Sequence, residues 1–179
     1  LGARVAKGIA LDEIVAYINE TALFRNQWQF RPEKGETDEQ FKERLRPTLR
    51  QQLAQARAEN LLNPAVVYGY YPCNGDGQDL VIWADESRDV EITRFTFPRA
   101  SKAPFLCIAD FFRPIESPDV DTVAFHIVTV GAAVADAAIE LMEAGKYADY
   151  MQLHGLGNEM AEALAEYWHH RIREELGYA

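Results

Sequence analysis

The sequence has few cysteines, a deficit of basic residues and no long hydrophobic run. Cys73 and Cys107 are the only cysteines among 179 residues. They form no CxxC pair, so we expect buried free thiols in a reducing, cytoplasmic compartment. Eighteen Lys and Arg against 28 Asp and Glu leave a net charge of −10, which argues against nucleic-acid partners and against electrostatic docking to anionic membranes. The most apolar stretch, residues 120–139, is interrupted by two aspartates and a histidine, which excludes a transmembrane helix there.

The remaining composition is that of a globular protein. Hydrophobic residues make up 48% of the chain and charged residues 26%. A chain of this length buries roughly 70% of its unfolded surface, so no metal or disulfide is needed for stability. No repeat, low-complexity tract or linker interrupts the sequence, and we expect a single domain over residues 1–179.

Helical periodicity is expected at both ends of the chain. Apolar residues spaced by three and four predict a first helix over residues 11–19. Thr37 with Gln40 has the pattern of a capping box that opens a long helix over residues 38–62. Pro47 is expected to kink or split that helix. The segment from residue 132 to residue 176 is helical in pattern, first to Gly145 and again from about Tyr147.

The middle of the chain has the composition of strands. Residues 65–71 and 80–83 are rich in β-branched and aromatic side chains and flank a turn at residues 74–77, which predicts a hairpin. A third strand around residues 90–97 would complete an antiparallel meander. Residues 105–112 and 123–130 are two further apolar segments, and the second is expected to be a buried central strand. The predicted fold class is therefore α+β, an antiparallel β-sheet flanked by helices.

Familiar catalytic motifs are scarce. The glycines of residues 69–77 match neither GxGxxG nor a P-loop and indicate a turn. His126 lies in an apolar strand and is expected to be a core histidine. His154 precedes two glycines, Gly155 and Gly157, whose missing side chains favour a close approach by a packed neighbour or a ligand.

Acidic residues and histidines recur along the last helix at spacings of three and four: Glu159, Glu162, Glu166, His169 and His170. Glu166 and His169 have the ExxH spacing that di-iron bundles use twice. One copy in a strand-rich chain cannot build the paired site, so no metal is expected. We expect instead a solvated face on which Glu166 and His170 form an i, i+4 pair.

Several segments taken together resemble the activation domain of cobalamin-dependent methionine synthase. The resemblance runs from about residue 11 to the last residue, and the order and spacing of its segments match the family. They are residues 17–20 (YINE), 67–74 (VYGYYPCN), 95–99 (FTFPR), 106–111 (LCIADF), 161–169 (AEALAEYWH) and 176–179 (LGYA).

This resemblance implies a reactivation module of a methyltransferase, 5-methyltetrahydrofolate-homocysteine S-methyltransferase. Such a domain binds S-adenosylmethionine and serves the reductive methylation of cob(II)alamin, which a separate cobalamin-binding module holds. The implied electron donor is a flavodoxin or a similar reductase. The long helix carries four arginines that either form a basic patch for that acidic partner or lie on the solvent-exposed face of the helix: Arg44, Arg46, Arg50 and Arg57.

The resemblance also implies ligand-binding positions. The family's glutamate on the late helix matches Glu162, and a carboxylate suits a ligand with ribose hydroxyls, a sulfonium and an ammonium. The family's aspartate at the end of the first helix falls on Asn19. Losing a charged hydrogen bond there is expected to weaken the contact about fivefold, unless the neighbouring Glu20 substitutes.

One family motif is absent from these residues. The Arg-x-x-x-Gly-Tyr loop of the family lies downstream of the segment that matches residues 177–179, so we expect a C-terminally truncated form of the domain. Two functions stay open: a reactivation module that binds S-adenosylmethionine, and a non-catalytic module that docks to a corrinoid protein or a flavodoxin without binding the nucleoside.

Overall fold

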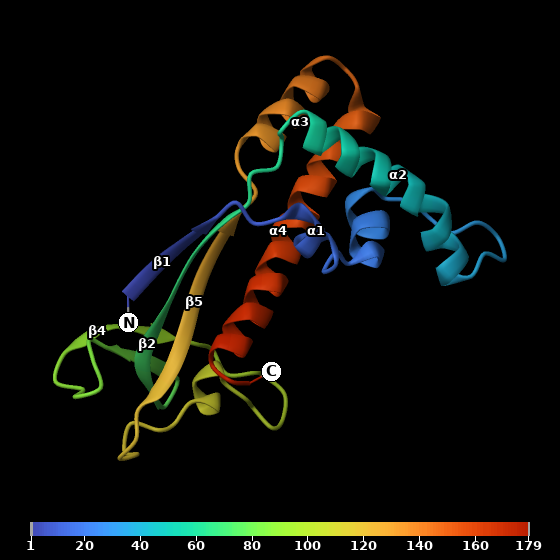
Figure 1. Ribbon diagram of the computed structural model, residues 1–179. Coiled ribbons are helices and arrows are strands. Elements are labelled where there is room, and N and C mark those ends of the chain that lie inside the picture. Colours follow the sequence, from blue (N-terminus) through green and yellow to red (C-terminus); the bar gives the residue numbers. More distant parts are fainter. Residues whose placement is uncertain (1, 179) are drawn as a thin grey trace. The chain divides into compact units, whose positions relative to one another are not determined.

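The computed structural model describes residues 2–178 and confirms the α+β class (Figure 1). The chain divides into two compact units, which we describe separately. Unit 1 contains residues 2–4 and Tyr68–Phe125, and unit 2 contains Val5–Val67 and residues 126–178.

The strands follow the predicted meander. In sequence order they are β1 (Gly2–Lys7), β2 (Ala65–Asp76), β3 (Asp79–Trp83), β4 (Glu91–Thr96) and β5 (Asp121–Thr129). The sheet has the order β1-β2-β3-β4, and β5 pairs with β2. β2 and β3 pair antiparallel, as do β3 and β4.

The hairpin turn lies two residues later than expected. Asp76 pairs with Asp79, so Gly77 and Gln78 form the turn, and Gly77 has a φ of +63°. The glycine at position 75 instead serves packing within the strand. A Cβ there would lie 2.6 Å from the carbonyl oxygen of Ala109, which only glycine tolerates.

The core of unit 1 lies on one face of the sheet. Cys73, Leu80, Ile82 and Val123 are buried together, with Tyr71, Phe97 and Phe112 packed against them. The apolar segment at residues 105–112 is not a strand, because a short 3-10 helix (Ile108–Phe111) and a loop occupy it. The expectation of a buried central strand at residues 123–130 is also wrong. β5 alternates, with Phe125 and Ile127 exposed, because it pairs with β2 alone and one of its faces meets solvent.

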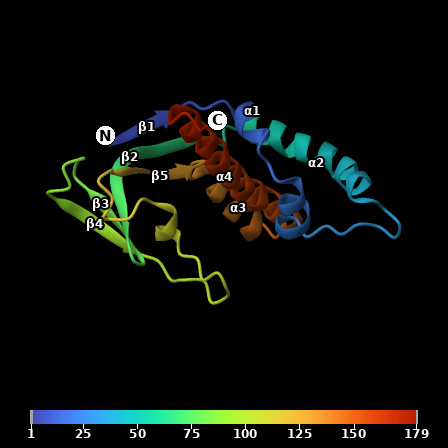
Figure 2. The ribbon, with the colours of Figure 1, turned by 90° about the horizontal axis from the view of Figure 1, so that it is seen from below.

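The α-helices and the π-helix lie in unit 2. They are α1 (Leu11–Val15), the π-helix η1 (Ala22–Gln27), α2 (Asp38–Ala58), α3 (Ala133–Glu143) and α4 (Tyr147–Glu175). α4 packs against α3, η1 and α1, and more lightly against α2. Figures 1 and 2 both show α3 alongside the first half of α4.

The end of the first helix needs correction, and one of the two alternatives for Pro47 is excluded. The first helix ends at Val15 rather than near Asn19, because the following residues turn into η1, whose backbone bonds span five residues. Pro47 does not split α2, which is continuous from Asp38 to Ala58. Pro47 is exposed, so its ring meets solvent rather than a packed neighbour. The predicted capping box is confirmed: Thr37 Oγ1 accepts from the Gln40 N–H at 3.3 Å, and Gln40 Oε1 accepts from the Thr37 N–H at 3.0 Å.

The two cysteines are free and buried. Burial raises the pKa of the Cys73 thiol to about 12, and Cys107 is 2% exposed. The thiolate is the reactive form. We therefore expect both thiols to react with a disulfide reagent at pH 8 at least about tenfold more slowly in the folded protein than in the unfolded protein.

The measurement is a timed thiol titration with and without denaturant. Replacing Cys73 by serine identifies which thiol reacts. Rapid reaction of either thiol in the folded protein would contradict this burial.

Candidate functional site

The candidate site is built on the middle of α4, and all of its residues belong to unit 2. Gly155 sets how closely η1 approaches this helix. A Cβ at Gly155 would lie 2.8 Å from Gln27 Cβ and 2.9 Å from Trp28 Cδ1. Trp28 Nε1 also donates to the carbonyl oxygen of Gln152 at 2.9 Å. The glycine therefore serves helix packing, one of the two roles expected from the sequence.

Asn19 lies in the link between α1 and η1. Its side-chain Oδ1 accepts from the N–H of Ala22 at 3.1 Å, at the start of η1. Its own main-chain N–H donates to Glu159 Oε1 at 2.8 Å. The Asn19 amide oxygen is thus engaged by the backbone, whereas its Nδ2 group forms no hydrogen bond with another described residue.

Glu20 is held by an arginine. Arg46 Nε donates to Glu20 Oε1 and Arg46 Nη2 to Glu20 Oε2, both at 2.8 Å. Arg46 also donates to Glu39 at 2.7 Å, and these carboxylates raise the pKa of the guanidinium. A bidentate pair of this kind fixes the carboxylate and neutralises it. Glu20 therefore presents no free charge beside Asn19.

A cavity of about 420 Å³ borders Asn19 and Glu20. Its wall combines apolar and polar side chains, with one cation, and comes from α1, the α1–η1 link and α2. The other lining residues are Val15, Ala16, Ile18, Thr21, Lys42 and Leu49.

Glu162 and Glu159 lie one helical turn apart on α4 but differ in burial. Glu162 is exposed. Glu159 is 1% exposed, and its Oε2 has no hydrogen-bond partner among the described residues. Burial raises the pKa of Glu159, and the charge of Glu162 raises it further, while the bond from the Asn19 N–H opposes the shift.

The spacing of acidic residues along α4 does not predict the burial of Glu159. The available signal was its position within an apolar stripe, because Leu156, Met160 and Ala163 are buried around it. A charged residue at such a position is rare unless it is paired. Among the described residues, neither Glu159 nor Glu162 forms an ion pair. Of these two carboxylates, that of Glu162 is exposed and that of Glu159 is covered by protein.

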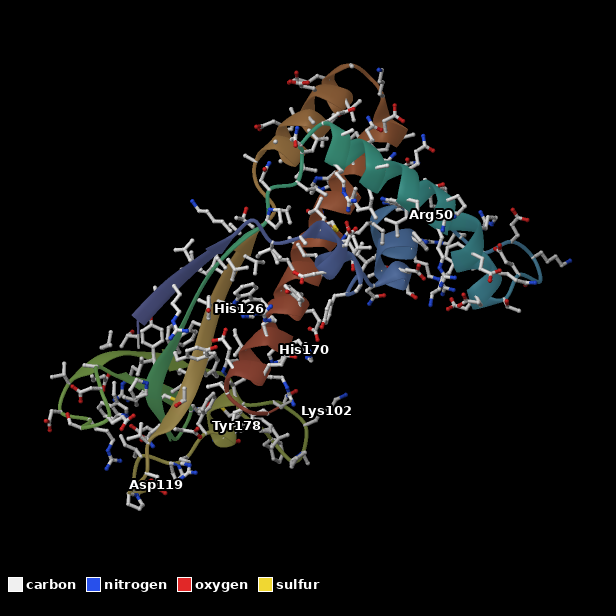
Figure 3. All side chains as sticks on the ribbon, in the orientation of Figure 1. Arg50, Lys102, Asp119, His126, His170 and Tyr178 are labelled. Carbon is white, nitrogen blue, oxygen red and sulfur yellow. The ribbon has the colours of Figure 1, made fainter. Side chains whose placement is uncertain are left out.

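The end of α4 does not form a metal site. No group of three or more His, Cys, Asp and Glu side chains among residues 2–178 could hold a metal ion. The expected pair between Glu166 and His170 is wrong, because His170 Nε2 lies 3.3 Å from Glu174 Oε1 instead. Figure 3 shows His170 on α4 and His126 on β5. Burial lowers the pKa of the half-buried His126, and the charge of His169 lowers it further.

The arginines of α2 are largely neutralised. Arg44 contacts Glu36 at 2.8 Å, Arg57 contacts Asp12 at 2.6 Å, and Arg46 holds two glutamates as described above. These contacts favour the interpretation of a solvated helix face over that of a basic docking patch. No helix in the described part of the chain is long and apolar enough to cross a membrane.

Comparisons with known proteins agree with this architecture. Residues 10–179 match the family described as "Vitamin B12 dependent methionine synthase, activation domain". The chain is 40% identical over 188 aligned residues to methionine synthase of Mycobacterium tuberculosis, and likewise to that of Mycobacterium leprae. In each case the alignment covers 99% of this chain and 16% of the relative. The chain thus spans about a sixth of the length of these relatives.

A solved structure is also similar. It is described as "Crystal Structure of the MetH Reactivation Domain bound to AdoHcy", and it aligns with a TM-score of 0.82 and 27% sequence identity. The alignment covers 97% of this chain and 55% of that chain.

Proposed function

We propose, from the premise that the chain belongs to the family of vitamin B12 dependent methionine synthase activation domains, that it binds S-adenosylmethionine and serves to reactivate the cobalamin cofactor of such a synthase. The parent protein would then be a methyltransferase that methylates homocysteine. The solved relative is bound to AdoHcy, which differs from S-adenosylmethionine by the methyl group and positive charge at sulfur.

The site residues fit such a ligand. The observation that carries the proposal is the exposed carboxylate of Glu162, which forms no ion pair with a described residue and lies one helical turn from Glu159, to which the Asn19 N–H is bonded. S-adenosylmethionine presents a sulfonium and an ammonium, both of which favour negative groups. Glu162 would bind the ligand directly and Asn19 through its Nδ2 group. The paired Glu20 would contribute least.

The ligand supplies the methyl group for reductive methylation of cob(II)alamin on a separate cobalamin-binding module. We propose a flavodoxin or similar reductase as the electron donor and the cytoplasm as the compartment. The two unbridged cysteines support the compartment. The paired arginines of α2 give this acidic donor little positive surface there, so we place its contact elsewhere.

The alternative function, a docking module that has lost nucleoside binding, is less well supported. Glu162 is retained and exposed, and the solved relative is bound to AdoHcy. Asn19 in place of the family's aspartate is the observation in favour of the alternative.

The test is calorimetric titration of S-adenosylmethionine into the chain. We expect Glu162→Ala to raise the dissociation constant at least about tenfold, because it removes a charged hydrogen bond to the ligand. Glu166→Ala, an exposed glutamate one turn further along α4, is the control and should leave binding unchanged.

The titration should be repeated on a longer form that includes the family's Arg-x-x-x-Gly-Tyr loop. Binding by neither form would contradict the proposed function and favour the docking module. Equal binding by the wild type and the Glu162→Ala variant would remove Glu162 from the site.

A further inference from the structure

The side chain of Glu159 is the most anomalous polar group in unit 2. Asn74, in unit 1, is the other buried polar or charged residue among those described, and it is fully bonded. Glu159 has one bond from a backbone N–H and one oxygen with no partner. A buried carboxyl with an unused oxygen is costly unless another group compensates it.

Its position connects the two expected ligand contacts. Glu159 Oε1 holds the main chain of Asn19 at 2.8 Å. Glu162, three residues later on the same helix, is close enough for its charge to raise the pKa of Glu159. The link carrying Asn19 is therefore fixed to α4 at the turn that carries Glu162.

The charges around Glu159 favour the binding of a cation. Glu162 is negative, and Glu20, next to Asn19, is already neutralised by Arg46. Lys42, which lines the cavity beside Asn19, contacts Asp38 at 2.9 Å. A cationic ligand at Asn19 and Glu162 would supply the missing positive charge.

We propose that Glu159 is a positioning residue of the S-adenosylmethionine site. Glu159 holds Asn19 by its main-chain N–H, and its buried carboxylate favours the cationic sulfonium ligand over its neutral thioether counterpart. This inference rests on the proposed function. Glu159 acts through Asn19 and through its electric field, because its side chain is covered by protein. Attraction between unit charges at short range in a protein interior is large enough to change binding about tenfold or more.

The test compares two ligands that differ in charge at sulfur. S-adenosylmethionine and S-adenosylhomocysteine are titrated calorimetrically into the wild-type protein and into the Glu159→Gln and Glu166→Gln variants. The titrations use the chain itself or the longer form with the Arg-x-x-x-Gly-Tyr loop, whichever binds the ligands. Glutamine keeps an oxygen for the Asn19 N–H and removes the charge. We expect Glu159→Gln to raise the dissociation constant of S-adenosylmethionine about tenfold and that of S-adenosylhomocysteine less than about twofold. Glu166→Gln, the solvated control, should change neither.

Thermal unfolding of each variant shows that the fold is intact. If the Glu159→Gln variant binds both ligands as tightly as the wild type, or if its affinity for both ligands falls by the same factor, the inference is overturned while the proposed function stands. If the wild-type protein binds neither ligand in either form, the proposed function fails and the inference fails with it. A selective loss of the sulfonium ligand supports the inference, because a purely structural role would affect both ligands alike.

Discussion

Replacing Asn74 by leucine is expected to lower the free energy of unfolding of unit 1 by about 4 kcal/mol. Asn74 is fully buried. Its Nδ2 group donates to the carbonyl oxygens of Arg113, Pro114 and Asp119 at 3.2 to 3.3 Å. Its Oδ1 accepts from Trp83 Nε1 at 3.0 Å. Leucine leaves two of these groups, Trp83 Nε1 and the Asp119 carbonyl oxygen, without a partner among the described residues, and each unmet group costs about 1–3 kcal/mol. The carbonyl oxygens of Arg113 and Pro114 keep their bonds from the N–H groups of Gly75 and Ser117.

Urea unfolding monitored by far-ultraviolet circular dichroism measures this loss. The graded control is Trp83→Phe, which removes one of the four bonds and keeps an aromatic ring, so its cost should be near 1 kcal/mol for the bond, with a further contribution from the smaller ring. A leucine variant as stable as the wild type would show that the loop at residues 113–119 does not depend on Asn74.

Replacing Gly155 by valine is expected to destabilise unit 2 by about 3 kcal/mol. The new Cβ would lie 2.8 Å from Gln27 Cβ, which is bonded directly to the backbone and has little freedom to move. The two methyl groups add further overlap with Trp28. Either η1 separates from α4 or the helix shifts, and both changes expose buried surface.

The control for this substitution is Glu166→Val on the exposed face of the same helix. It introduces the same β-branched residue without a packed neighbour, so its effect should stay within about 0.5 kcal/mol. Denaturant unfolding followed by circular dichroism at 222 nm compares the two. Equal stability of the two variants would contradict the packing role of Gly155.

Much of the fold could be predicted because it rests on local signals. The Thr37–Gln40 capping box, the β-branched strands and the uninterrupted pattern of α4 are properties of neighbouring residues. The end of α1 and the π-helix could not be predicted in this way. η1 has bonds such as that from the Trp28 N–H to the Leu23 oxygen, which span five residues, and the spacing of apolar residues at three and four does not encode them.

The candidate site was predicted in part. The resemblance supplied Glu162, Asn19 and Glu20, and their binding roles remain predictions. The bonds from Asn19 to Glu159 and from Arg46 to Glu20 join residues that are 140 and 26 positions apart. No local pattern contains such pairs, because they depend on how the helices pack. For the same reason, the spacing of acids along α4 could not separate the buried Glu159 from the exposed Glu166.

The open edge of the sheet affects how the protein behaves at high concentration. β4 is the last strand in the order β1-β2-β3-β4, and all six of its residues are exposed, including Ile92 and Phe95. An unpaired edge with apolar side chains can template pairing with a second molecule. Arg94 stands in the middle of this strand within contact of Glu91, Asp76 and Asp79. Two copies meeting edge to edge would bring these carboxylate clusters together, so mutual repulsion at neutral pH opposes self-association, and acidification weakens that protection.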